Sequence, residues 1–319
     1  MSAPVIRTVL GDVDPAALGR VNYHEHLFQV SPLLRGDELD NETASGAEAA
    51  LLKGSGFETM IDATPMGVGR EPEAVARISA STGLAVVATT GRHREAHYAA
   101  DHPTRSANAA QLAALFIADV AEGMPVSDDA ADGPRAVGPA GDPVRAGMLK
   151  GGIDYWRIND FERTTLLAVA ETHRATGAPI MVHLEFCTAA HEVLDLLADE
   201  GVSSDRVVLA HADRDPDAGL HLSLAERGAY LGYDGFARPR TRSDAELLTL
   251  TAEVVAGGGS DRVLLGGDVA RATRYISYGG MPGLAYLGER YVPRLQALVG
   301  ADAVDRMLTT NPAQLLALR

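Results

Sequence analysis

Two histidines near the N-terminus, His24 and His26, are separated by one residue at the end of an apolar, strand-forming segment. In an extended strand, side chains two residues apart project to the same side, so both imidazoles can converge on one metal ion. Neutral imidazole is the commonest protein ligand for zinc-like metals. A lone His-x-His pair is a weak signal, because two unrelated surface histidines give the same pattern. The pair predicts a metal site only if further ligands stand at the ends of other strands.

Other polar side chains end apolar runs elsewhere in the chain. One histidine in such a place is more often a half-buried structural residue than a ligand. A whole set is hard to explain by stability, since burying each polar group costs free energy unless it is paired. We therefore predict one metal site that is formed by His24, His26, Lys150, His183, His211 and Asp268.

Eight short apolar runs alternate with helical patterns, and this alternation predicts the elements that position these residues. Strands with helical crossovers predict an α/β fold, a (β/α)8 TIM barrel, formed as a single domain over residues 1–319. In this fold the active site lies at the C-terminal ends of the strands, where the candidate ligands stand. The predicted strands are 20–24, 57–62, 84–89, 146–150, 179–184, 206–211, 228–233 and 262–267.

One stretch, residues 124–142, is rich in glycine, proline and aspartate. Such composition is typical of exposed connections without regular structure. We expect a mobile surface loop there.

Composition limits the class of partner. The formal net charge of -15 argues against a nucleic-acid backbone as partner. No apolar run is long enough to span a bilayer, so we expect no membrane partner. The N-terminus lacks the basic-then-apolar order of a signal peptide, and the single cysteine, Cys187, is compatible with a reducing cytoplasm. We expect a cytoplasmic protein that acts on a small molecule. A homodimer is compatible with the sequence.

Over almost its whole length the chain resembles the phosphotriesterase-like family of the amidohydrolase superfamily, and in particular its lactonase-type members. The motifs include GRVNYHEHL, IDATPMGVGR and RGAYLGYDG, which are highly specific when taken together. The matching segments are residues 19–27, 61–70, 146–150, 177–183, 211–214, 227–235, 278–287 and 311–313.

The resemblance implies a binuclear metal centre with two divalent ions per chain. Zinc is the expected metal, with manganese, cobalt or iron as alternatives. His24, His26 and Asp268 would hold one ion, and His183 and His211 the other. The resemblance also implies that carbon dioxide carboxylates Lys150, because a lysine ammonium is a poor ligand whereas an anionic carbamate can bridge two ions.

Hydrolysis in this family implies attack by a metal-bridging hydroxide. Asp268 and the carboxylated Lys150 would be the catalytic residues, with Asp268 accepting the proton and returning it to the leaving oxygen. Two roles remain open for Asp213. It could orient a ligand histidine or relay the proton, or it could cap the helix that follows.

Three arginines follow the last two predicted strands: Arg238, Arg271 and Arg274. In relatives that act on phosphorylated sugar lactones, a basic residue, an arginine and a tyrosine occupy the matching positions, so Arg274 replaces the tyrosine. Arginine binds phosphate or carboxylate bidentately, which suggests an anionic substrate. The alternative is that these are solvated loop residues or salt-bridge partners.

We therefore expect a hydrolase that opens an anionic, phosphorylated sugar-type lactone. One alternative is a phosphotriesterase or carboxylesterase that acts on neutral esters. Outside enzymes, the alternative is a non-catalytic binding barrel.

Overall fold

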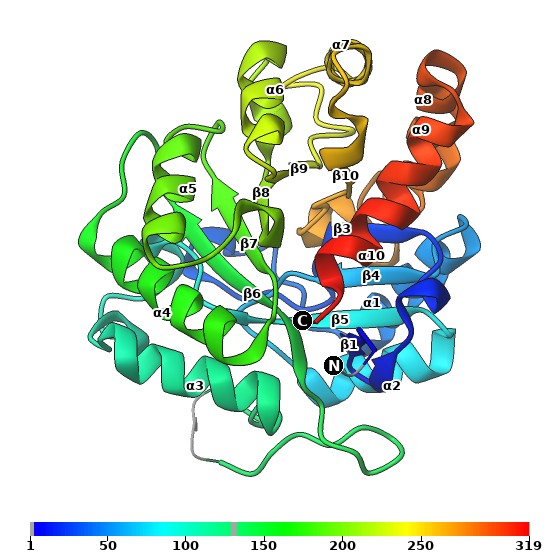
Figure 1. The fold of residues 1–319 in the computed structure, drawn as a ribbon. Coiled ribbons are helices and arrows are strands. Elements are labelled where there is room, and N and C mark those ends of the chain that lie inside the picture. The colour runs from blue at the N-terminus through cyan, green and yellow to red at the C-terminus, as the bar shows by residue number, and fades with distance from the viewer. Residues whose placement is uncertain (1–2, 129–132, 319) are drawn as a thin grey trace.

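A computed structural model describes residues 3–128 and 133–318 of the chain. Eight parallel strands lie side by side in chain order, and helices pack around them (Figure 1). This confirms the predicted (β/α)8 barrel and all eight predicted strands. The strands are β3 (Val21–Glu25), β4 (Thr59–Asp62), β5 (Ala85–Gly91), β6 (Ala146–Ile153), β7 (Ile180–Leu184), β8 (Val207–Ala210), β9 (Tyr230–Tyr233) and β10 (Val263–Leu265).

The barrel closes where β10 meets β3. The backbone amides of Gly267 and Asp268 donate to the carbonyl of His24 at 3.2 and 2.9 Å. Gly266 permits this approach, because a Cβ at that position would lie 2.8 Å from the His24 nitrogen. The closure therefore places Asp268 directly beside His24.

Helices cover the outside of the barrel (Figure 1). Three of them, α3, α4 and α7, begin with a capping box. In it the N-cap side chain accepts from the N3 backbone amide, and the N3 side chain accepts from the N-cap backbone amide. The helices are α1 (Glu42–Gly54), α2 (Pro72–Thr82), α3 (Ala109–Ala121), α4 (Asp160–Thr176), α5 (Ala190–Asp199), α6 (Ala218–Glu226), α7 (Asp244–Ala256), α8 (Val292–Val299), α9 (Ala301–Asp305) and α10 (Asn311–Leu316).

Strand side chains divide between two buried layers. Alternate residues such as Met181 and Val208 fill the barrel interior, whereas Val182 and Leu209 pack outward into the main cluster against the helices. Parallel strands buried on both faces read as continuous apolar runs, which is why the sequence revealed them.

A short antiparallel hairpin precedes the barrel and was not predicted from the sequence. It consists of β1 (Ile6–Thr8) and β2 (Gly11–Val13). Val5 forms an isolated β-bridge with Leu318, so the two ends of the described chain lie side by side (Figure 1). Ile6 is buried with the residues of the barrel interior, and the hairpin thus covers the end of the barrel opposite the predicted site.

Backbone pairing and an ion pair hold parts of the stretch at residues 124–142. Its residues 129–132 lie outside the described residues. In the described part, Asp128 accepts from the buried Arg70 at 2.6 Å, and two β-bridges tie the segment together. The bridges pair Pro125 with Arg135 and Val137 with Pro143. Most of the described part lies at the surface without helix or strand, as expected, and its mobility stays a prediction.

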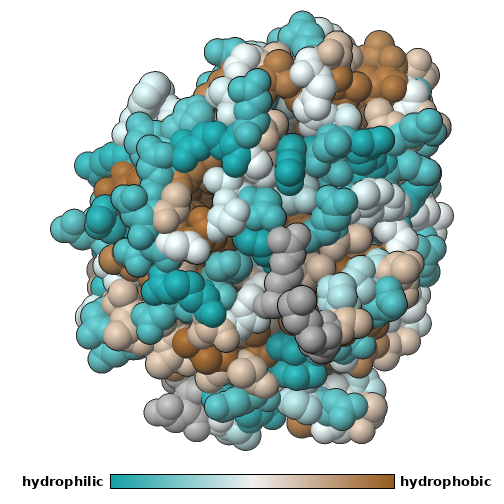
Figure 2. Space-filling view, viewed as in Figure 1, coloured by the Kyte–Doolittle hydropathy of each residue, from teal (hydrophilic) through white to brown (hydrophobic). Residues whose placement is uncertain are grey.

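Hydrophilic side chains predominate on the face shown in Figure 2, and hydrophobic ones are scattered among them. Among the described residues, no helix combines the length and the apolar character needed to cross a membrane.

Candidate metal centre

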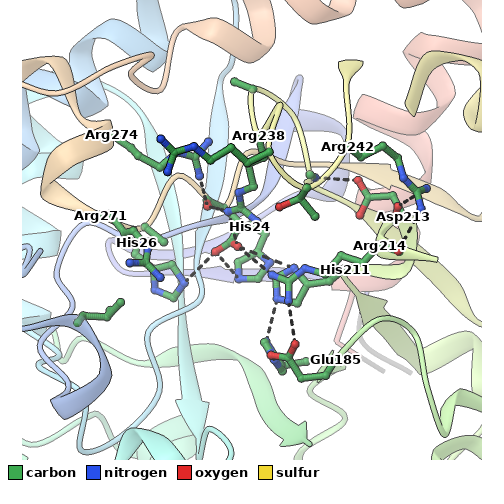
Figure 3. Close-up of a pocket in the computed structure, with 18 of the residues that line it drawn as sticks. His24, His26, Glu185, His211, Asp213, Arg214, Arg238, Arg242, Arg271 and Arg274 are labelled. Atoms are coloured by element: carbon green, nitrogen blue, oxygen red, sulfur yellow. Dashed lines mark hydrogen bonds and ion pairs between the residues drawn. The ribbon is translucent and has the colours of Figure 1, made fainter. Parts of the chain in front are cut away.

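The six predicted ligands converge at the C-terminal end of the barrel. The four histidines and Asp268 line a cavity of about 940 Å³, and Lys150 lies fully buried beneath it. Each predicted ligand comes from a different strand or strand end, except that His24 lies in β3 and His26 directly follows it. Figure 3 shows the labelled histidines, His24, His26 and His211, gathered in one part of the pocket. The barrel therefore brings together residues that lie far apart in the sequence.

His24 and His26 both present an Nε2 lone pair to Asp268. Each Nε2 lies 3.7 Å from Asp268 Oδ1. The Nδ1–H of His26 donates to the Thr64 hydroxyl at 2.8 Å, and that hydroxyl donates onward to the Phe28 carbonyl. Two ligand atoms that share a tetrahedral zinc at about 2.1 Å lie roughly 3.4 Å apart, so these atoms could hold one ion.

An aspartate absent from the predicted set, Asp234, fixes two of the histidines. It directly follows β9, and its Oδ2 accepts from His24 Nδ1 at 2.9 Å while its Oδ1 accepts from His211 Nδ1 at 2.7 Å. The Tyr23 hydroxyl also donates to it. A ring nitrogen that donates to a carboxylate leaves the other nitrogen free to bind metal. The sequence pattern that could have revealed Asp234 is the one used for the predicted ligands, a polar residue at the end of an apolar run.

His183 and His211 lie in direct contact with each other. His211 Nε2 lies 2.8 Å from His183 Nδ1, and His183 Nε2 lies 3.0 Å from Glu185 Oε1. Because His211 gives its one proton to Asp234, its Nε2 is a lone pair. If His183 donates to His211, its other lone pair faces the Glu185 carboxylate; if it donates to Glu185, two lone pairs face each other. A cation bound by both nitrogens would remove this conflict, with the rings moved apart from 2.8 Å to the roughly 3.4 Å that separates two ligands of a tetrahedral zinc.

Burial keeps the donor atoms deprotonated. It lowers the pKa of His24, and it lowers the pKa of His26 and His183 well below the usual value. Burial also lowers the pKa of His211 to about 3. For Asp268, burial acts to raise the pKa, but Arg238 and the histidines hold it well below the usual value. Metal ligands must be deprotonated, so this set is suited to a cation.

Lys150 is fully buried, and its Nζ lies 3.3 Å from His24 Nε2. Burial lowers its pKa to about 8, against the opposing effect of Asp268. At pH 7 roughly one such amine in ten is neutral, compared with about one in three thousand for a lysine in water. The neutral amine is the form that reacts with carbon dioxide, so the position fits the expected carbamate.

Two site residues hold a strained backbone. His211 has φ of 63° and Asp268 has φ of 41°, in the left-handed region that non-glycine residues rarely adopt. Such conformations persist where the surrounding structure imposes them, and they cluster at functional sites.

Asp213 supports Asp234 and does not cap a helix. Its Oδ2 accepts from the backbone amides of Asp234 and Gly235 at 3.1 and 2.7 Å. The cap of α6 is Asp217, which accepts from Gly219. The helix-capping alternative is therefore wrong, and Asp213 holds the turn that carries Asp234. The role of orienting a ligand histidine stays a prediction, and so does the proton-relay role.

Glu185, a second residue that sequence reasoning missed, lies in the loop after β7. Besides its contact with His183, its Oε1 pairs with Arg94 Nη2 at 2.9 Å, and its Oε2 lies 3.6 Å from Arg214. The sequence offers no pattern that would single it out. Its role depends on which side chains surround it in the folded barrel.

The three predicted arginines all line the cavity. Arg238 Nη2 lies 2.7 Å from Asp268 Oδ2, and Arg271 pairs with Asp37 at 3.3 Å. Among the described residues, Arg274 donates only to backbone carbonyls, including that of Asp268 at 3.3 Å. The salt-bridge alternative is confirmed for Arg238 and Arg271, and substrate binding by the three arginines stays a prediction.

The comparisons with known proteins agree with this geometry. The sequence matches the Phosphotriesterase family over residues 4–316. A phosphotriesterase homology protein of Mycobacterium tuberculosis is 30% identical over 284 residues, which cover 83% of this chain and 81% of that protein. A phospho-furanose lactonase of Mycoplasmopsis agalactiae is 29% identical, over 98% of this chain and 91% of that protein. The solved structure of a lactonase from Listeria monocytogenes superimposes with a TM-score of 0.89, at 28% identity and over 99% of both chains.

The family match spans all eight barrel strands and every residue of the site. The chain therefore belongs to the phosphotriesterase family and is a hydrolase that acts on ester or lactone bonds.

Proposed function

We propose that the protein is a binuclear metal-dependent lactonase whose substrate is an anionic, phosphorylated sugar-type lactone. The observation that carries the proposal is the convergence of two groups of deprotonated donors, one with His183 and His211 and one with His24, His26 and Asp268. This arrangement calls for cations, and it lies at the floor of a cavity whose rim is lined by arginines.

The donor set divides into two halves. His24, His26 and Asp268 would hold one ion, and His183 and His211 the other. Lys150, as a carbamate, would lie between them. Nitrogen and carboxylate donors suit zinc, with manganese, cobalt and iron as alternatives. When bound, the two ions would activate water for attack and polarise the ester carbonyl.

The chain's own groups would move the proton and hold the substrate. Asp268 is a carboxylate that faces the cavity, so it can accept the proton of the attacking water and return it to the leaving oxygen. Arg238, bonded to its Oδ2, keeps the pKa of Asp268 low. Arg238, Arg271 and Arg274 would bind the anionic group of the substrate, since guanidinium forms charge-assisted hydrogen bonds to phosphate. The relatives named phospho-furanose lactonases support this choice.

The test is a substrate panel on metal-replete protein: a furanose lactone phosphate, a neutral lactone and a phosphotriester. We expect about two divalent ions per chain and a kcat/KM for the phosphorylated lactone at least tenfold above that for the neutral one. Arg274→Gln should lose about 1–3 kcal/mol of charge-assisted hydrogen bonding, or roughly tenfold to a hundredfold in kcat/KM, on the phosphorylated lactone alone.

A preference for the phosphotriester or for neutral lactones would contradict the proposed substrate. Protein that carries two ions but turns over nothing on the panel would instead favour a binding barrel.

A further inference from the structure

Positive charge is concentrated at the cavity to an unusual degree. In a chain with a net charge of -15, the lining includes seven arginines but only three carboxylates, Glu185, Asp213 and Asp268. A cavity lined by one sign of charge attracts ligands of the opposite sign. The arginines are Arg94, Arg214, Arg238, Arg240, Arg242, Arg271 and Arg274.

The labelled arginines lie on two sides of the histidines. Figure 3 shows Arg271 and Arg274 on the side of His26, and Arg214 and Arg242 on the opposite side, beyond His211. The first group comes from the loop after β10, and the second from the loops after β8 and β9. The proposed reaction centre thus lies between two groups of guanidinium side chains.

The second group is held in place but keeps unused donors. Arg242 donates from Nη1 to the Asp213 carbonyl at 2.9 Å and from Nη2 to the Arg214 carbonyl at 3.2 Å. Within the described residues it has no carboxylate partner. A guanidinium carries five N–H donors, so most of those on Arg242 remain available. Arg242 is therefore positioned by the backbone. No carboxylate of the described residues contacts it, although its charge contributes to lowering the pKa of the exposed Glu246.

Arg214 and Arg240 add to this group. The Arg214 guanidinium lies 3.6 Å from Glu185 Oε2 and 3.7 Å from Asp268 Oδ2, too far for a hydrogen bond to either carboxylate. Arg240 is exposed at the rim and forms no side-chain interaction with the described residues. Arg240 thus has no partner among the described residues, and Arg214 forms two ion pairs without a hydrogen bond to either carboxylate.

We propose that Arg214, Arg240 and Arg242 form a second anion-binding subsite, so that the substrate carries two anionic groups, one on each side of the ester bond. This inference rests on the proposed function and narrows its substrate class. A singly phosphorylated lactone would satisfy only the group of Arg271 and Arg274. A phosphate, sulfate or carboxylate at the other end of the substrate would bind the second group. The cavity of about 940 Å³ has room for such an elongated molecule.

The experiment compares two probes that cannot be hydrolysed as lactones. Ribose 5-phosphate carries one anionic group, and ribulose 1,5-bisphosphate carries two. Calorimetric titration of metal-replete protein should give a dissociation constant at least a hundredfold lower for the bisphosphate. Arg242→Gln and Arg240→Gln should each reduce this ratio of affinities about tenfold.

Two further variants serve as references. Arg274→Gln belongs to the first group, so it should weaken the binding of both probes. Arg163→Gln, an exposed position on α4 outside the cavity, should change neither affinity. If Arg242→Gln fails to fold, Arg240→Gln still tests the subsite, because that side chain has no structural contact.

A ratio near one in the unmodified protein, or a high ratio that both Arg240→Gln and Arg242→Gln preserve, would overturn the second subsite. Turnover of a singly phosphorylated lactone, measured on the same preparations, keeps the two proposals apart. Turnover with a ratio near one refutes the second subsite and leaves the proposed function intact. A high ratio that falls in these variants, without turnover of any lactone, supports the subsite and refutes the lactonase.

Discussion

Replacing Asp234 by asparagine removes one of two carboxylate oxygens that together orient histidines of both proposed metal halves. In the native chain, Oδ2 accepts from His24 at 2.9 Å and Oδ1 accepts from His211 at 2.7 Å. An amide offers one accepting oxygen and one donating nitrogen. One histidine would therefore keep its partner, and the other would meet a donor where it needs an acceptor.

The expected loss follows from these contacts. A hydrogen bond to a buried charged group contributes about 1.5–3 kcal/mol, which corresponds to roughly tenfold to a hundredfold in a binding constant. Mutations of residues that orient metal-binding histidines give losses of the same size. We expect one of the two ions to bind about 10- to 100-fold more weakly in Asp234→Asn, with a parallel fall in kcat/KM.

The assay is a competitive titration of each ion with a chromophoric chelator, together with elemental analysis of the dialysed protein. Tyr23→Phe is a graded reference, because the hydroxyl donates to Asp234 but the carboxylate remains; it should lose less than tenfold. Asp195→Asn is the matched control, since Asp195 pairs only with Arg227 at the surface. Retention of both ions at native affinity in Asp234→Asn would refute the role assigned to this carboxylate.

Two other outcomes follow from the buried groups of the site. Lys150→Ala should lose metal and activity and regain part of both with added bicarbonate or a short-chain carboxylate, which can occupy the space left by the side chain. Lys150→Arg should regain neither, because a permanent cation cannot bridge two ions, and a fully active arginine variant would contradict the carbamate. In metal-free protein, burial lowers the pKa of His211 and of His97, which also lines the cavity, to about 3, so below pH 6.5 the unfolded state binds protons that the folded state does not. Each of these histidines should therefore lower the stability by about 1.4 kcal/mol as the pH drops from 7.5 to 5.5, whereas Glu25, whose pKa burial raises to about 8, acts in the opposite direction. The measurement compares urea midpoints of the native protein and of His97→Gln at the two pH values, and an equal pH dependence of the two proteins would show that His97 is not held neutral.

The sequence by itself determined the barrel and most of the proposed ligand set. Strands buried on both faces must read as apolar runs, and a polar residue that ends such a run stands out because its burial is costly. Parallel strands in a barrel bring all their C-terminal ends to one mouth. For this reason the strand ends place five residues from His24 to Asp268 at one site, whereas Lys150 is assigned as a ligand through the family resemblance.

Only the tertiary structure decided how these residues are held. Asp234 also directly follows a strand, but the sequence does not show which residues it contacts. Its partners are His24, 210 residues away along the chain, and His211, 23 residues away. Asp213 proved to bind the backbone of the neighbouring turn and not a helix terminus. Local sequence specifies periodicity and strand ends. Hydrogen-bond partners, by contrast, depend on loop paths and side-chain rotamers that are fixed when the barrel closes between β10 and β3.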